Sequence, residues 1–117
     1  MTRFAVALLA LITIVQAQTV NAASADDFYR GKTIRVIVGF AAGGGFDQYA
    51  RTIARHMPKH IAGNPTMIVD NMGGAGSRLA ANYLYKASAP DGLTIGNFIG
   101  SLLLQQILGD QGVEFDG

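Results

Sequence analysis

The chain contains no cysteine among its 117 residues. It therefore cannot form a disulfide, offers no thiol nucleophile and has no cysteine side chain that could carry a lipid. A small secreted domain held together by disulfides is excluded. If the protein is exported, a bacterial periplasm is the compartment that this composition favours.

The sequence also lacks any block of like charge. Nine basic residues, one of them Arg3 near the start, stand against eight acidic residues spread along the chain. A nucleic-acid-binding protein would carry a basic patch that neutralises phosphates. The charge pattern therefore argues against a nucleic-acid partner.

The chain begins with the features of a secretory signal peptide. Arg3 precedes the uncharged apolar run 4–15, and the small residues of "VNAASA" follow. This layout is typical of a cleaved signal, and the run is shorter than the ~20 residues of a membrane span. Cleavage after Ala22 or after Ala25 would fit. An N-terminal membrane anchor is the alternative.

We therefore predict a signal peptide over residues 1–22 and a periplasmic mature chain over residues 23–117. The mature part repeats one plan three times: a β-rich run, a loop of small residues, and a segment with helical periodicity. The expected strands are Thr33–Phe40, Thr66–Asn71 and Leu93–Ile99, and the expected helices run from Asp47 to about Met57, from Ser77 to about Ala87, and from Leu102 to Leu108.

Two further details of this plan can be tested. Val36, Ile37 and Val38 are apolar on both faces, as in a buried parallel strand. The first two helices should bury the stripes Ala50, Ile53, Ala54, Met57 and Ala80, Tyr83, Leu84, Ala87. Together these patterns predict an α/β fold with a parallel sheet.

The loops that follow the three strands are the strongest functional signal. They span 41–46, 72–77 and 100–101, and all three consist mainly of small residues. Parallel connections gather such loops at one edge of the sheet, where ligands of open α/β sheets bind. Helix starts and glycine-rich turns present unpaired N–H groups there, which favour an anion such as a carboxylate. The alternative is that the glycines only allow helix and strand to pack closely.

Single residues in these loops have two interpretations each. Asp47 is a helix cap or dipole partner, or it faces the cleft and selects ligands with a hydroxyl or an amine. Ser77 and Ser101 are expected mainly to cap the helices that follow them, and the alternative is that they donate hydrogen bonds to a ligand. Phe40 and Phe46 could both line the cleft. The alternative for Phe40 is packing in the core, and the alternative for Phe46 is an ordinary exposed aromatic in a loop.

Familiar catalytic and nucleotide-binding motifs are incomplete. "RGKT", residues 30–33, lacks the earlier glycine of a P-loop, and "GGAGSRLA" has Leu79 at the third glycine of a dinucleotide fingerprint. His56 and His60 have helical spacing but no third metal ligand nearby. We find no Ser-His-Asp order and no paired carboxylates. An exported enzyme with a Rossmann-like nucleotide site is the alternative to a binding protein.

Three stretches carry a resemblance to a known family: "FYRGKTIRVIVGFAAGGGFDQYAR", "NPTMIVDNMGGAGS" and "ANYLYKASAPDGLTIG". After a signal peptide, they resemble the substrate-binding proteins of tripartite tricarboxylate transporters, the Bug family, over most of residues 28–109. The resemblance implies a monomeric periplasmic receptor without a cofactor, which traps a small carboxylate between two lobes and passes it to a membrane permease without catalysing a reaction. It also implies a three-layer, periplasmic-binding-protein-like lobe that is cut short, with residues 23–117 as its N-terminal part and the second lobe absent.

The resemblance also indicates which residues would hold the ligand. In the family, the backbones of the first two loops help to hold one ligand carboxylate, partly through water. The second loop, "NMGGAGS", departs from the family pattern near Gly73 and Ser77, which leaves the role of Ser77 open. Carried over by motif, the candidate ligand-binding residues are Phe40, Ala41, Ala42, Gly43, Gly44, Gly45, Phe46, Asp47, Gly74, Ala75, Gly76, Ser77, Gly100 and Ser101.

Overall fold

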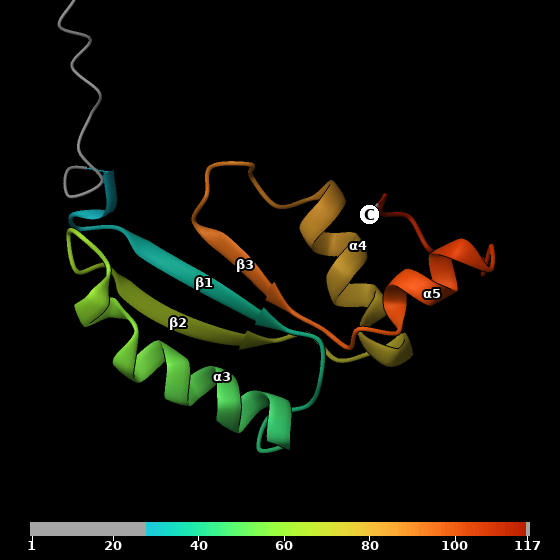
Figure 1. Ribbon diagram of the computed structural model, residues 1–117, viewed down its shortest axis with the longest axis horizontal. Coiled ribbons are helices and arrows are strands. Elements are labelled where there is room, and N and C mark those ends of the chain that lie inside the picture. Colours follow the sequence, from blue (N-terminus) through green and yellow to red (C-terminus); the bar gives the residue numbers. More distant parts are fainter. Residues whose placement is uncertain (1–27, 117) are drawn as a thin grey trace, which may run out of the picture.

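The computed structural model describes residues 28–116 and places three parallel strands in one sheet. The predicted signal peptide lies outside these residues. The strands are β1 (Thr33–Val38), β2 (Thr66–Asn71) and β3 (Thr94–Asn97), in the spatial order β2-β1-β3 (Figure 1). The chain therefore forms β2 on one side of β1 and then crosses to the other side to form β3. The predicted α/β fold with a parallel sheet is confirmed.

Three α-helices connect or follow these strands. They are α3 (Gly45–His56), α4 (Arg78–Lys86) and α5 (Leu102–Ile107), and the short 3₁₀ turns η1 (Pro58–His60) and η2 (Ala75–Ser77) lie between them. Helix α3 begins two residues before the predicted start at Asp47, because the extended backbone of Gly44 already forms its N-cap. It ends before Pro58, as a proline at that position predicts.

The two long helices lie on opposite faces of the sheet. Val36 and Val38 on β1 pack with Ala50 of α3. Arg35 points to the other face, where it forms an ion pair with Asp70 and interacts with Tyr83 of α4. Side chains alternate between faces along a strand, so α3 and α4 enclose the sheet as the outer layers of a three-layer unit.

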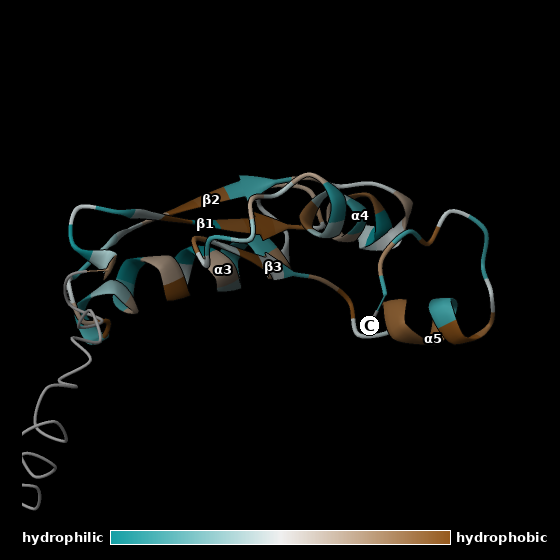
Figure 2. Ribbon diagram, turned by 90° about the horizontal axis from the view of Figure 1, so that it is seen from above, coloured by the Kyte–Doolittle hydropathy of each residue, from teal (hydrophilic) through white to brown (hydrophobic). Residues whose placement is uncertain are grey.

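Strand β1 supplies most of the buried apolar surface. Ile34, Val36, Ile37 and Val38 are all buried, which confirms the prediction of a parallel strand buried on both faces at Val36 to Val38. Each such side chain contributes roughly 1.5–3 kcal/mol on burial. Figure 2 shows β1 as largely hydrophobic, while α5 stands clear of the sheet. The core therefore centres on β1 and the helices packed against it.

The predicted helix stripes are only partly right. Met57 is 42% exposed, because it lies beyond the last turn of α3. Ala87 is exposed for the same reason at the end of α4, and the buried residue that periodicity missed is Ala81. Strands β1 and β3 are also shorter than predicted, since the chain leaves the sheet after Val38 and Asn97.

A close contact joins the end of β1 to the start of α4. A Cβ on Gly39 would lie 2.5 Å from Ser77 Cβ, so this position has no room for a side chain. The buried Ser77 hydroxyl donates to the Gly39 carbonyl oxygen at 3.2 Å. Glycine is therefore required at position 39 for packing.

We expect Gly39→Ala to destabilise the fold by about 1–3 kcal/mol, the usual cost of overpacking. The measurement is the midpoint of urea unfolding. Gly100→Ala is the matched control, because an added methyl group there meets no atom within 4 Å. The double variant Gly39→Ala, Ser77→Gly should recover most of the loss by removing the opposing side chain. A Gly39→Ala variant as stable as Gly100→Ala would contradict this packing argument.

Candidate functional site

The loops that follow the first two strands touch each other. The Met72 N–H donates to the Val38 carbonyl oxygen at 2.8 Å. A Cβ on Gly73 would lie 3.5 Å from the backbone nitrogen of Ala41. The first loop (residues 39–44) and the second loop (residues 72–77) therefore form one continuous surface at the carboxyl edge of the sheet.

The first loop exposes its backbone. Ala41 to Gly45 are all exposed, and a turn closes with the Gly44 N–H donating to the Ala41 carbonyl oxygen at 3.5 Å. Gly43 has a φ of +83°, which glycine adopts readily. Gly45, Phe46 and Asp47 form the first turn of α3, where amides have no intrahelical acceptor. Such amides can bind an anion.

The buried side chain of Asp47 is hydrogen-bonded to the backbone of the first loop. Its side chain is 3% exposed, and its Oδ2 accepts the Gly43 N–H at 2.8 Å and the Arg51 Nε–H at 2.9 Å. Asp47, at position N3, thus reaches back across the helix start as in a capping box, but the amide that it binds belongs to Gly43, one residue before the N-cap Gly44. Its other oxygen, Oδ1, is buried without a hydrogen-bond partner in the described part of the chain. This geometry favours the cap interpretation of Asp47 over direct selection of a ligand.

The surroundings of Asp47 keep it ionised. The hydrogen bond from Arg51 and then that from the Gly43 N–H lower the pKa of the carboxyl from 3.8 to about 2, against the opposing effect of burial. The carboxylate is therefore charged at any physiological pH, and Arg51 balances its charge.

The second loop has an unusual backbone. Gly74, Ala75, Gly76 and Ser77 have consecutive φ angles of 146°, 46°, 61° and 73°. Residues with a Cβ adopt this left-handed region at a cost. At Ser77, this conformation accompanies the bond to Gly39, and the hydroxyl makes no cap bond to α4. The prediction that the Ser77 side chain caps the helix is therefore wrong. Gly74, Ala75 and Gly76 are exposed.

Two aromatic rings border the first loop. Phe40 and Phe46 stack with their ring centroids 4.3 Å apart and their planes at 22°. Phe40 also packs against the core, whereas Phe46 is partly exposed. Together with Gly45, Tyr49 and Asn97, Phe46 lines an open hollow of about 390 Å³. Of the two stacked rings, that of Phe46 is thus the one that faces this hollow.

The third loop lies at the same edge but is less closely joined. The Gly39 N–H donates to the Asn97 carbonyl oxygen at 3.0 Å, and the Asn97 side-chain amide donates to the Phe46 carbonyl oxygen at 3.3 Å. Gly100 and Ser101 are exposed, and no hydrogen bond joins them to the first two loops within residues 28–116. Ser101 makes no side-chain cap bond, contrary to the first interpretation of that residue.

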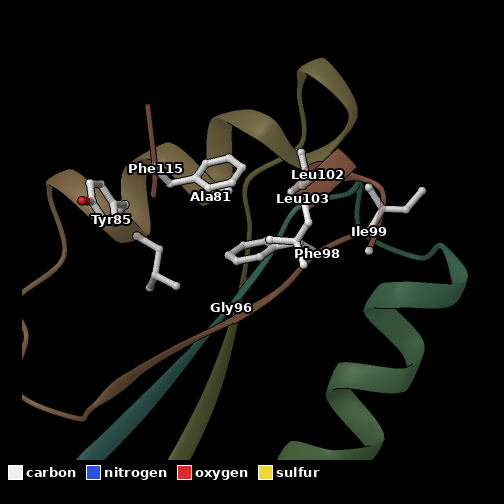
Figure 3. A pocket seen from close by; sticks show the side chains of 10 residues that line it. Ala81, Tyr85, Gly96, Phe98, Ile99, Leu102, Leu103 and Phe115 are labelled. Carbon is white, nitrogen blue, oxygen red and sulfur yellow. The ribbon is translucent and has the colours of Figure 1, made fainter. Parts of the chain in front are cut away.

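Gly100 instead borders an apolar groove between α4 and the segment from Phe98 to α5. The groove has a volume of about 630 Å³, and Figure 3 shows side chains of Phe98, Leu102 and Phe115 among those that line it. The structure therefore brings the first and second loops into one surface and places the third loop between that surface and an apolar groove.

Sequence reasoning missed two residues at the site. The Asn71 side-chain amide donates to the Phe40 carbonyl oxygen at 3.1 Å, and the Arg51 Nη2–H donates to Asn71 Oδ1 at 3.2 Å. Arg51 follows Asp47 by four residues, a spacing that predicts an ion pair on a helix. Asn71, at the carboxyl end of β2, could have been found as a polar residue where the loops meet.

We also searched residues 28–116 for a metal site and for a membrane-spanning helix. This part of the chain contains no group of three or more side chains that could hold a metal ion, so His56 and His60 have no partners for one. None of its helices combines the length and the apolar character needed to cross a membrane.

We expect Asp47→Asn to lower stability at neutral pH, because it removes the charge that Arg51 pairs with. The folded-state pKa of Asp47 is depressed, so its contribution is fully present above about pH 4 and is lost as the pH falls toward 2. Urea midpoints of both proteins across this range should therefore converge at low pH. Asp110→Asn, at an exposed position, controls for the change in net charge. A stability difference that stays constant from pH 7 to pH 2 would refute this assignment.

Comparisons with known proteins found similar sequences and a similar solved structure. No family profile matches the chain. A UPF0065 protein in the TAR-I ttuE-ttuC' intergenic region of Agrobacterium vitis is 41% identical over 70 residues, which are 60% of this chain and 19% of that protein. A UPF0065 protein in the gbd 5' region of Cupriavidus necator is 41% identical over 73 residues, which are 62% and 21% of the two chains. The chain thus spans about one fifth of the length of these relatives.

A solved structure described as a periplasmic transporter is 40% identical and superimposes with a TM-score of 0.52, covering 58% of this chain and 22% of that one. This likeness supports a periplasmic-binding-protein-like fold for the three-layer unit. Over the matched residues, the chain is similar to the UPF0065 proteins and to this periplasmic transporter, which agrees with the resemblance of its motifs to the Bug family of tripartite tricarboxylate transporter receptors.

Proposed function

We propose that the chain forms part of a periplasmic solute-binding receptor that captures a small carboxylate for a tripartite tricarboxylate transporter. The observation that carries the proposal is the continuous surface of exposed backbone made by the first and second loops. The similarity of the chain to UPF0065 proteins and to a periplasmic transporter supports the receptor class and a periplasmic location.

Backbone amides, rather than basic side chains, would bind the carboxylate. The first-turn amides of Gly45 and Phe46 have no intrahelical acceptor and lie at the positive end of the α3 dipole. Each hydrogen bond from such a donor to a charged group contributes roughly 1.5–3 kcal/mol. Two or three of these bonds would be enough to hold one carboxylate group. The ring of Phe46 would contact the apolar part of the ligand.

Such a receptor binds and releases its ligand without making or breaking a bond. Its remaining contacts would come from a second lobe, and a membrane permease would receive the ligand. We therefore assign no catalytic residue and no cofactor. The alternative, a Rossmann-like nucleotide-binding enzyme, would need a pyrophosphate contact at the same loops and is tested alongside.

We expect citrate, malate or benzoate to raise the unfolding temperature of the protein, while the matched neutral amides have no effect. The shift should shrink as salt is added, because the attraction is electrostatic. Differential scanning fluorimetry measures both effects. Stabilisation by NAD rather than by the acids would favour the enzyme, and no response to any acid would count against the receptor.

Gly45→Leu should abolish carboxylate binding while the fold is retained. The added side chain would enter open space above the first-turn amides, since a Cβ there meets no atom within 4 Å. Thr52→Leu adds similar bulk at an exposed position of the same helix, away from the loops, and should bind normally. Isothermal titration with citrate gives the comparison. Equal affinity of both variants would exclude these amides as the binding groups.

A further inference from the structure

Arg51 is linked to both loops through the two residues that its nitrogens bind, Asp47 and Asn71. Its Nε–H donates to Asp47 Oδ2 at 2.9 Å, and Asp47 holds the Gly43 amide of the first loop. Its Nη2–H donates to Asn71 Oδ1 at 3.2 Å, and Asn71 is the last residue of β2, directly before the second loop. The planar guanidinium group is suited to such a double contact because its donors are fixed relative to one another.

The chain of contacts closes on itself. The Asn71 side-chain amide donates to the carbonyl oxygen of Phe40 in the first loop at 3.1 Å. The network therefore runs from Gly43 through Asp47, Arg51 and Asn71 back to Phe40. Half of the Arg51 side chain remains exposed, so its role is not explained by core packing.

The contact between Arg51 and Asp47 also affects the charge near the proposed anion site. Asp47 is buried directly beneath the loop that would receive a carboxylate, and an uncompensated negative charge there would repel the ligand. Arg51 places a positive charge 2.9 Å from the Asp47 carboxylate. The pair is neutral as a whole, which leaves the partial positive charge of the helix start available to an anion.

We propose that Arg51 is the positioning residue of the carboxylate site: it joins the first and second loops into one cradle and cancels the charge of Asp47 beneath it. The part that concerns ligand affinity rests on the proposed function, whereas the joining of the loops does not. Arg51 acts through Asp47 and Asn71, and contact with the ligand is not required.

The first test compares Arg51→Gln with Arg55→Gln, one turn further along the exposed face of α3. Both remove one positive charge from the same helix, but no hydrogen bond or ion pair links Arg55 to Asp47 or Asn71 in the described chain. Titration with citrate should show affinity about tenfold weaker for Arg51→Gln, because the Asp47 carboxylate near the anion then lacks its counter-charge. Arg55→Gln should bind within about twofold of the original protein, because its charge is screened by solvent.

A double variant separates charge cancellation from a general loss of structure. Asp47→Asn combined with Arg51→Gln restores neutrality, and an asparagine oxygen can still accept the Gly43 N–H. Citrate affinity should return to within about threefold of the original protein, since the repelling charge is gone. A double variant as weak as Arg51→Gln alone, or an Arg51→Gln variant that binds normally, would overturn the electrostatic role.

The joining of the loops has its own readout, which needs no ligand. In ¹⁵N-resolved spectra of the free proteins, Arg51→Gln should shift the amide signals of Gly43 in the first loop and Gly73 in the second, while Arg55→Gln leaves both in place. If citrate fails to bind the original protein but these shifts appear, the proposed function is wrong, while the proposal that Arg51 joins the two loops is retained. If neither glycine signal moves, Arg51 does not join the loops.

Discussion

The close approach of Gly39 to Ser77 determines how the binding edge is built. No side chain fits between the two residues, and the Ser77 hydroxyl bonds to the Gly39 carbonyl oxygen. The contact joins the end of the central strand to the start of α4, so it fixes where the second loop meets the first. The hydrogen bonds from Met72 to Val38 and from Gly39 to Asn97 extend this arrangement across all three strands. The edge is therefore held by backbone contacts, which leaves its amides oriented before any ligand arrives.

The polar network around Asp47 serves the same edge in a different way. Asp47 and Arg51 place two opposite charges beneath the first loop, and Asn71 connects them to the second. These side chains bond to one another and to the loop backbone, and the exposed residues of both loops are mostly glycine and alanine. A surface of this kind offers backbone donors to an anion, which suits the carboxylate ligand that we propose.

Much of the fold could be predicted because local sequence and burial agree. The predicted strand Thr66–Asn71 agrees residue for residue, and the run Val36 to Val38 correctly indicated a buried strand. Periodicity failed where a segment ends: Met57 fits the stripe of α3 but lies beyond its last turn. The positions of the loops followed from topology alone. The left-handed backbone of Ser77 and the bridge from Arg51 to Asn71 could not be predicted, because both depend on residues far apart in the sequence that meet only in the folded chain.

The three successive left-handed residues from Ala75 to Ser77 have a consequence for sequence change in the second loop. Valine, isoleucine and threonine are strongly disfavoured at such angles, because a branched Cβ collides with the neighbouring peptide groups. Glycine, asparagine and aspartate are the residues that tolerate them best. The range of amino acids that this loop can accept is thus narrowed by its own main-chain path, independently of any solute that it contacts.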